Sequence, residues 1–217
     1  MTSVPLYIED QRLLYRQRPL LAMYRSPRSA WRDMPEARDW AFWIMTFQDI
    51  LQLIEGRIED PVLRRTVGVH RDEDGGHDKW YFEDLRTLAL PLGDGPDLFG
   101  ETHRPARELS YRQLGRVIEA RSDLERLIVL EVIEATSLSL FESTAEYVRR
   151  HGRERDLLFF SENHLNAELQ HDRRTEDENV IGALLESASA APHARMIEDC
   201  YGDFARFIDE LHERHYA

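Results

Sequence analysis

Apolar residues recur along most of the chain at intervals of three and four, which is the spacing of an α-helix that buries one face. Residues 36–58 carry a wide apolar face, of the kind that a central helix buries. No stretch alternates between apolar and polar positions for long enough to predict a β-strand. The pattern therefore predicts an all-α fold of seven or eight helices. The other helices are expected over 6–24 with an interruption at Pro19, over 61–88, over 122–150, from Asp156 through His171, from Thr175 toward Pro192, and from there to about His215.

Local signals mark several helix ends. Pro61 suits the first turn of a helix, and Ser122 with Glu125 forms a capping box for the helix that follows. Gly152 would end that helix. The main loop is expected over 91–105, where three glycines occur.

Composition and charge narrow the function classes. The chain is 42% hydrophobic and 32% charged, and it has neither an apolar run of membrane-spanning length nor a signal-peptide core near its start. A formal net charge of −13 argues against nucleic-acid binding, because phosphates need a basic surface. The single cysteine, Cys200, excludes an internal disulfide and agrees with a reducing compartment. A soluble, cytoplasmic protein with one domain over 1–217 is expected.

Two triplets of candidate metal ligands share one spacing. They are His70, Asp74 and His77, and then His164, Glu168 and His171. On a helix, positions i, i+4 and i+7 fall within roughly 60° of one another, so each triplet would present two imidazoles and a carboxylate along one stripe. One such triplet arises easily by chance among nine histidines, but the repeat favours a metal centre between two facing helices. Imidazole with carboxylate is the ligand set of oxygen-activating iron and manganese sites, and helical bundles hold dinuclear centres with acidic-x-x-His motifs.

Two features bear on this centre. Gly75 and Gly76 lie inside the first triplet, and each costs about 1 kcal/mol relative to alanine in a helix interior. Either the helix loosens here to admit a ligand, or it breaks and the spacing of the triplet fails.

A bundle site also needs a carboxylate from a further helix, and Glu134 is the best candidate, because it lies on an otherwise apolar stripe where an unpaired carboxylate is costly. Glu131 and Glu142 compete on periodicity, and an arginine could pair with Glu134 instead.

The segment from His70 through Trp80 to Leu85 resembles the signature of the heme-oxygenase-like diiron oxidases and oxygenases. In that signature two acidic residues, any residue and a Gly-His pair are followed by a tryptophan and an Asp-Leu pair. Glu134 and the second triplet then match the order of the family's remaining ligands, so the resemblance covers roughly residues 36–175. It implies a heme-oxygenase-like bundle of about seven helices without heme, a labile pair of irons, and O2 activation on small organic substrates.

By that resemblance, five residues are metal ligands, namely His77, Glu134, His164, Glu168 and His171. The sixth place departs from the family pattern. His70 stands where many members have a glutamate, and the acid three residues before His77 is Asp74 rather than a glutamate. Either His70 or Asp74 could complete the set.

The resemblance implies a nonheme iron-dependent oxidoreductase with two Fe(II) per chain, or Mn(II) in their place, and O2 as co-substrate. The substrate would be an amino acid, an amine or a fatty acid, oxidised by N-oxygenation, desaturation or carbon–carbon cleavage. The expected partners are this small molecule and at most a second copy of the chain in a homodimer, with neither nucleic acid nor membrane.

Three alternatives stand beside this interpretation. A thiaminase-like enzyme of the same fold uses a mid-chain cysteine nucleophile, whereas the cysteine here, Cys200, comes late. A cofactor-free, quinone-synthase-like enzyme of the same fold also lines a helical cavity with histidines. From a different class, the chain could be a non-catalytic helical binding or partner protein with vestigial metal stripes.

Overall fold

In the computed structural model, residues 2–171 and 178–217 are described, except for the side chains of residues 170, 171, 178 and 179. They form α-helices and two short 3-10 helices, and the β contact recorded among them is an isolated bridge between Ser3 and Ser189. The predicted all-α class is confirmed. The elements are α1 (Val4–Tyr15), α2 (Pro19–Arg25), η1 (Pro35–Trp40), α3 (Ala41–Arg57), α4 (Pro61–Glu73), α5 (His77–Thr87), η2 (Asp97–Phe99), α6 (Arg104–Glu119), α7 (Asp123–Arg150), α8 (Glu162–His171), α9 (Glu178–Ser187) and α10 (Ala194–Tyr216).

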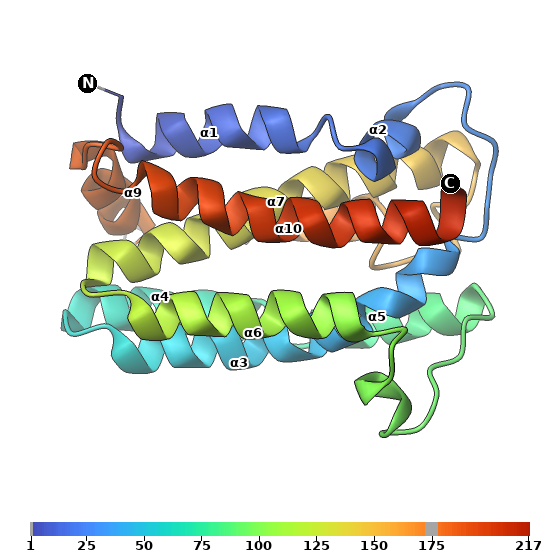
Figure 1. The fold of residues 1–217 in the computed structure, drawn as a ribbon, viewed down its shortest axis with the longest axis horizontal. Helices are drawn as coiled ribbons and strands as arrows, with labels where there is room; N and C mark the ends of the chain where they lie inside the picture. Colours follow the sequence, from blue (N-terminus) through green and yellow to red (C-terminus); the bar gives the residue numbers. More distant parts are fainter. Residues whose placement is uncertain (1, 172–177) are drawn as a thin grey trace.

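The long helices run lengthwise along the molecule (Figure 1). On one side, α3 packs against both α4 and α6. On the other side, α1 packs against α10. α7 contacts helices of both sides, among them α1, α3, α8 and α10, and therefore passes through the middle of the bundle.

α7 begins and ends where the sequence predicts. Ser122 is its N-cap residue, and the Ser122 Oγ accepts the N–H of Glu125 at 3.2 Å. At the other end, Gly152 follows the C-cap residue and has a φ of +66°. Side chains of α7 are buried along its whole length, because other helices surround it, and this helix supplies a large part of the core.

The helix expected over 61–88 is in fact two helices, α4 and α5. Asp74 is the C-cap residue of α4, and Gly76 precedes α5 with a φ of +101°, a conformation that L side chains rarely adopt. The single-helix prediction is wrong here, and the glycine pair is the physical reason. The expected number of helices is roughly matched, with this break and the short α2 after the interruption at Pro19 adding further segments.

α8 also begins later than predicted, at Glu162 rather than at Asp156. Residues 156–161 form turns and bends instead, because three backbone N–H groups in this segment donate to the side chain of Asp84 on α5. The predicted start of the next helix, at Thr175, lies outside the described residues.

The expected helix over 36–58 is present, but its first part is the 3-10 helix η1 and the α-helix begins only at Ala41. Between α5 and α6 the chain contains η2 and otherwise irregular structure, as predicted for residues 91–105. Among the described helices, none combines the length and the apolar character needed to cross a membrane.

Candidate metal centre

Three parts of the bundle bring histidines and carboxylates together: the junction of α4 and α5, the middle of α7, and α8. The donors form two clusters, and within each cluster the candidate ligand atoms lie within 4.8 Å of one another. The His164 cluster consists of His77, His164 and Glu168, and the Glu134 cluster consists of His70, Asp74 and Glu134.

In the His164 cluster two imidazoles face one carboxylate. Glu168 Oε1 lies 2.7 Å from His164 Nε2 and 3.3 Å from His77 Nδ1, and the two ring nitrogens are 3.1 Å apart. His164 and Glu168 are one helical turn apart on α8, so the spacing noted in the sequence places them on one face. His77 comes from the first residue of α5, and His164 is only 2% exposed.

In the Glu134 cluster one imidazole lies between two carboxylates. His70 Nε2 is 3.1 Å from Glu134 Oε1 and 3.3 Å from Asp74 Oδ2. Asp74 is 3% exposed, and its other oxygen, Oδ1, is 3.8 Å from His77 Nδ1. Asp74 therefore lies between the two clusters and links them.

Six of the seven residues expected as ligands lie in these clusters. The seventh, His171, ends α8, and its side chain lies outside the described residues. Both candidates for the sixth place, His70 and Asp74, lie beside Glu134. The first triplet does not form a single stripe, because the break after Asp74 directs His77 into the other cluster.

The competing carboxylates of α7 have different surroundings. Glu142 Oε2 is 3.1 Å from Nη1 of Arg12 and 3.1 Å from Nη1 of Arg16. The pairing with arginine that was an alternative for Glu134 thus occurs at Glu142. Glu131 lines a cavity beside the Glu134 cluster.

The electrostatics of the two clusters differ. Burial raises the pKa of Glu134 to about 7, against the opposing effect of the charge and hydrogen bond of His70. Burial alone would lower the pKa of His70, but the charge and hydrogen bond of Glu134 outweigh it and raise that pKa to about 10. Burial likewise opposes ionisation of Glu168, yet hydrogen bonds from His164 and His77 prevail and lower its pKa to about 2. A proton on His70 thus supplies the positive charge that Glu134 requires when no cation does.

The surroundings of His164 fit a metal ion. Its Nδ1 lies 3.0 Å from the carbonyl oxygen of Phe159, which can only accept, so we assign the ring proton to Nδ1. The neutral ring then directs the lone pair of Nε2 at Glu168 Oε1, another acceptor, only 2.7 Å away. Two acceptors this close need a shared proton or a cation between them. A histidine that donates its outer N–H to a backbone carbonyl is also the usual arrangement in metal sites.

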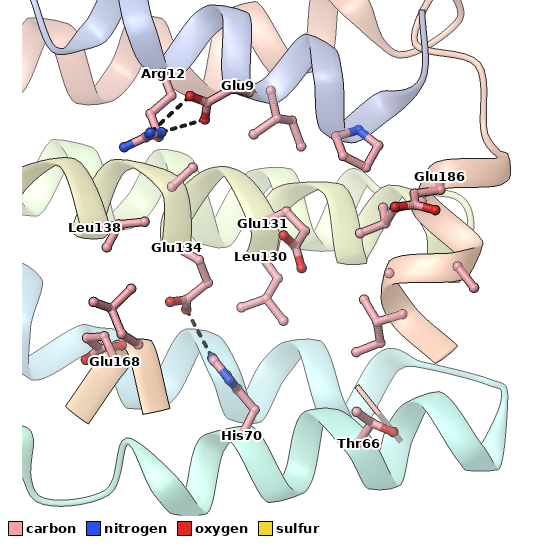
Figure 2. Close-up of a pocket in the computed structure, with 18 residues that line it drawn as sticks. Glu9, Arg12, Thr66, His70, Leu130, Glu131, Glu134, Leu138, Glu168 and Glu186 are labelled. Atoms are coloured by element: carbon pink, nitrogen blue, oxygen red, sulfur yellow. Dashed lines mark hydrogen bonds and ion pairs between the residues drawn. The ribbon is translucent and has the colours of Figure 1, made fainter. Parts of the chain in front are cut away.

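A cavity of about 700 Å³ borders the Glu134 cluster. α1, α4, α7, α8 and α9 contribute to its walls, and His70, Glu134 and Glu168 are among the side chains that line it. Figure 2 shows His70 and Glu134 directed toward one another from α4 and α7, with Glu131 further along α7. A small molecule in this cavity would contact the Glu134 cluster directly.

Aromatic side chains cover the His164 cluster. The ring centroids of Phe141 and Phe159 lie 3.9 and 4.5 Å from that of His164, and Trp80 stacks on His77 at 4.6 Å. A smaller cavity of about 50 Å³ lies here among aromatic walls and donors of both clusters. Sequence reasoning missed Phe159, because its segment was expected to be part of a helix. An apolar cover strengthens the attraction between a cation and carboxylates by lowering the local dielectric.

Comparisons with known proteins do not assign the chain to a family. No protein-family model matches the chain, and no curated protein is significantly similar to it. The two clusters and the cavity are therefore the basis on which a function is proposed.

Proposed function

We propose that the protein is a nonheme diiron oxidase or oxygenase of the heme-oxygenase-like kind, which binds one Fe(II) in each cluster and uses O2 to oxidise a small organic substrate. The observation that carries the proposal is the pairing of two three-donor clusters in one largely buried region, with Asp74 between them. Mixed imidazole and carboxylate donors suit iron and manganese, so Mn(II) is the other metal considered.

Each cluster would hold one ion. Two histidines and a carboxylate form the His164 cluster, which matches the donor set of nonheme iron oxygenases, whereas the Glu134 cluster has one histidine and two carboxylates. With three protein donors each, both ions would keep open positions for O2 or substrate, and iron would supply the electrons for O2 reduction. His171 as an additional ligand stays a prediction of the family resemblance.

The cavity of about 700 Å³ is where the substrate would bind. Its volume falls within the usual range of small-molecule sites. Because His70, Glu134 and Glu168 line it, a bound substrate would lie against the Glu134 cluster and against Glu168, while aromatic side chains cover the imidazole rings of the His164 cluster. The candidate substrates are those of the resemblance: an amino acid, an amine or a fatty acid.

The thiaminase-like alternative finds no support in the surroundings of the cysteine. Cys200 is buried in α10, and burial raises the pKa of its thiol to about 12. A cysteine nucleophile needs access to substrate and a lowered pKa.

Mixing anaerobically Fe(II)-loaded protein with O2 tests the proposal. We expect rapid Fe(II) oxidation with new visible absorption in the wild type, and loss of this reaction in Glu134→Gln. Glu142→Gln is the matched control, because it changes a glutamate on the same helix that pairs with arginines. Fe(II) that reacts in the presence of the wild type no faster than in buffer alone would contradict an oxygen-activating function and favour a non-catalytic protein.

A further inference from the structure

A single buried carboxylate attaches the segment before α8 to α5. Asp84 Oδ1 accepts the N–H of Leu158 at 2.6 Å, and Oδ2 accepts the N–H groups of Phe159 and Phe160 at 2.9 and 3.0 Å. Asp84 is 1% exposed. Hydrogen bonds to a carboxylate are short and strong, so three of them from consecutive residues fix the path of the backbone at this point.

The same backbone is bonded to a residue of the His164 cluster. The carbonyl oxygen of Phe159 accepts the Nδ1–H of His164 at 3.0 Å. The peptide group that joins Phe159 to Phe160 therefore donates to Asp84 through its N–H and accepts from His164 through its C=O. A carboxylate at the N–H polarises the peptide and makes its carbonyl a better acceptor.

α5 thus acts on the His164 cluster in two ways. It supplies His77 directly, and about two turns further along it supplies Asp84, on a similar side of the helix. His77 reaches Glu168 and His164, whereas Asp84 reaches the peptide that bonds to the far side of the His164 ring.

We propose that Asp84 is a positioning residue for the metal centre. Through the Phe159–Phe160 peptide it holds the proton of His164 on Nδ1 and leaves the Nε2 lone pair directed at the ion. The inference rests on the proposed function, because it takes His164 as a metal ligand. Asp84 itself belongs to neither cluster and lines neither cavity, and its removal should weaken the His164 cluster while sparing the Glu134 cluster.

Titration with Co(II) alone tests this role in the wild type, in Asp84→Asn and in Glu83→Gln. An asparagine side chain has the same size but only one acceptor oxygen, so it cannot accept all three N–H groups. We expect the Co(II) affinity of the His164 cluster to fall about 10- to 100-fold, with the affinity of the Glu134 cluster unchanged. Glu83 is the matched control, because it precedes Asp84 on the same helix and pairs at the surface with Arg86.

A second readout needs no metal. In imidazole 15N spectra of the metal-free protein, we expect a proton on Nδ1 of His164 in the wild type, with a second proton shared between Nε2 and Glu168. In Asp84→Asn we expect part of the molecules to lose the Nδ1 proton and to adopt the tautomer protonated on Nε2 alone. A residue that only stabilised the loop would not move this tautomer.

The outcomes separate the two proposals. Unchanged Co(II) affinities with an unchanged His164 tautomer in Asp84→Asn would overturn the positioning role and leave the diiron proposal standing. A wild type that binds no Co(II) would remove the metal centre and this role with it. If Asp84→Asn does not fold, amide exchange in the metal-free wild type decides: slow exchange at residues 158–160 supports the bonds to Asp84, and exchange at the rate of an open peptide overturns them.

Discussion

Glu134 lies on a face of α7 that is otherwise largely apolar, with Leu130 and Leu138 one turn to either side. Its carboxylate faces His70, and burial raises its pKa to about 7. An ionised carboxylate in such a place is stabilised by a cation more than by water. The metal position proposed for the Glu134 cluster therefore depends on this side chain as well as on His70 and Asp74.

Glu134→Gln should remove one of the two metals. The amide keeps the shape of the side chain but loses the charge that holds the ion, so we expect about one iron per chain after anaerobic reconstitution, compared with about two in the wild type. Metal analysis of the desalted protein measures this. Glu131→Gln and Glu142→Gln should keep wild-type iron, and loss of iron in either of these with full occupancy in Glu134→Gln would mean that the wrong carboxylate was assigned.

His70 and Asp74 offer a second prediction. Because both lie beside Glu134, we expect His70→Ala and Asp74→Ala each to lower iron occupancy toward one per chain, whereas His70→Glu replaces one donor by another and should retain it. Iron per chain in the three variants is the measurement. Full occupancy in both alanine variants would show that neither His70 nor Asp74 is needed as a metal ligand.

Six of the residues singled out in the sequence lie close together in the structure, but the sequence does not show how they divide into two clusters. His164 and Glu168 meet because a regular helix carries them, and helical spacing is visible in a sequence. His70 and His77 belong to different clusters because the backbone turns at Gly76. Spacing alone does not show whether a glycine pair is a tolerated irregularity or a break.

Among the helices, the junction of α4 and α5 depends on a positive φ at Gly76. An alanine there is strained whatever space surrounds it, and we expect Gly76→Ala to lower the free energy of unfolding by about 1–2 kcal/mol. Gly115 on α6 is the matched control, because nothing lies within 4 Å of an added Cβ and an alanine there should stabilise by about 0.5–1 kcal/mol. Urea unfolding of the metal-free proteins compares them, and equal effects of both substitutions would contradict the account of the junction.

The contact between η1 and the end of α10 should make stability depend on pH. Glu36 is 0% exposed and accepts the hydroxyl of Tyr216 at 2.5 Å, and burial raises its pKa to about 7. Below the ordinary glutamate pKa the group is protonated in both folded and unfolded states, so its stabilising effect is complete. As the pH rises through that value toward 7 the unfolded state ionises first, and folding loses up to about 3 kcal/mol.

Glu36→Gln should remove this dependence, because the amide oxygen still accepts from Tyr216 and does not titrate. We expect the variant to be more stable than the wild type at pH 8, with the difference shrinking toward pH 5. Denaturant unfolding of the metal-free proteins at both pH values measures it, and parallel pH profiles for the two proteins would contradict a buried, titrating Glu36.

Contacts between residues that lie far apart in the sequence could not be predicted from the sequence. The caps of α7 could be predicted, since Ser122, Glu125 and Gly152 act within a few residues of one another. The late start of α8 could not, because the amides of residues 158–160 bind Asp84, more than seventy positions earlier in the chain. A local pattern carries no information about such a partner.

The bundle as a whole places α7 against helices of both sides and so brings the donors of four helices to its middle. The large cavity beside the Glu134 cluster and the aromatic cover of the His164 cluster make the two sides of the centre different. This arrangement is what separates the proposed centre from a set of surface ion pairs.

Anomalous diffraction from crystals grown with Mn(II) would locate the ions of the proposed dinuclear centre. We expect two manganese peaks per chain, one among His77, His164 and Glu168 and the other among His70, Asp74 and Glu134. Absence of both peaks at saturating Mn(II), or peaks only at other places on the molecule, would contradict the dinuclear centre.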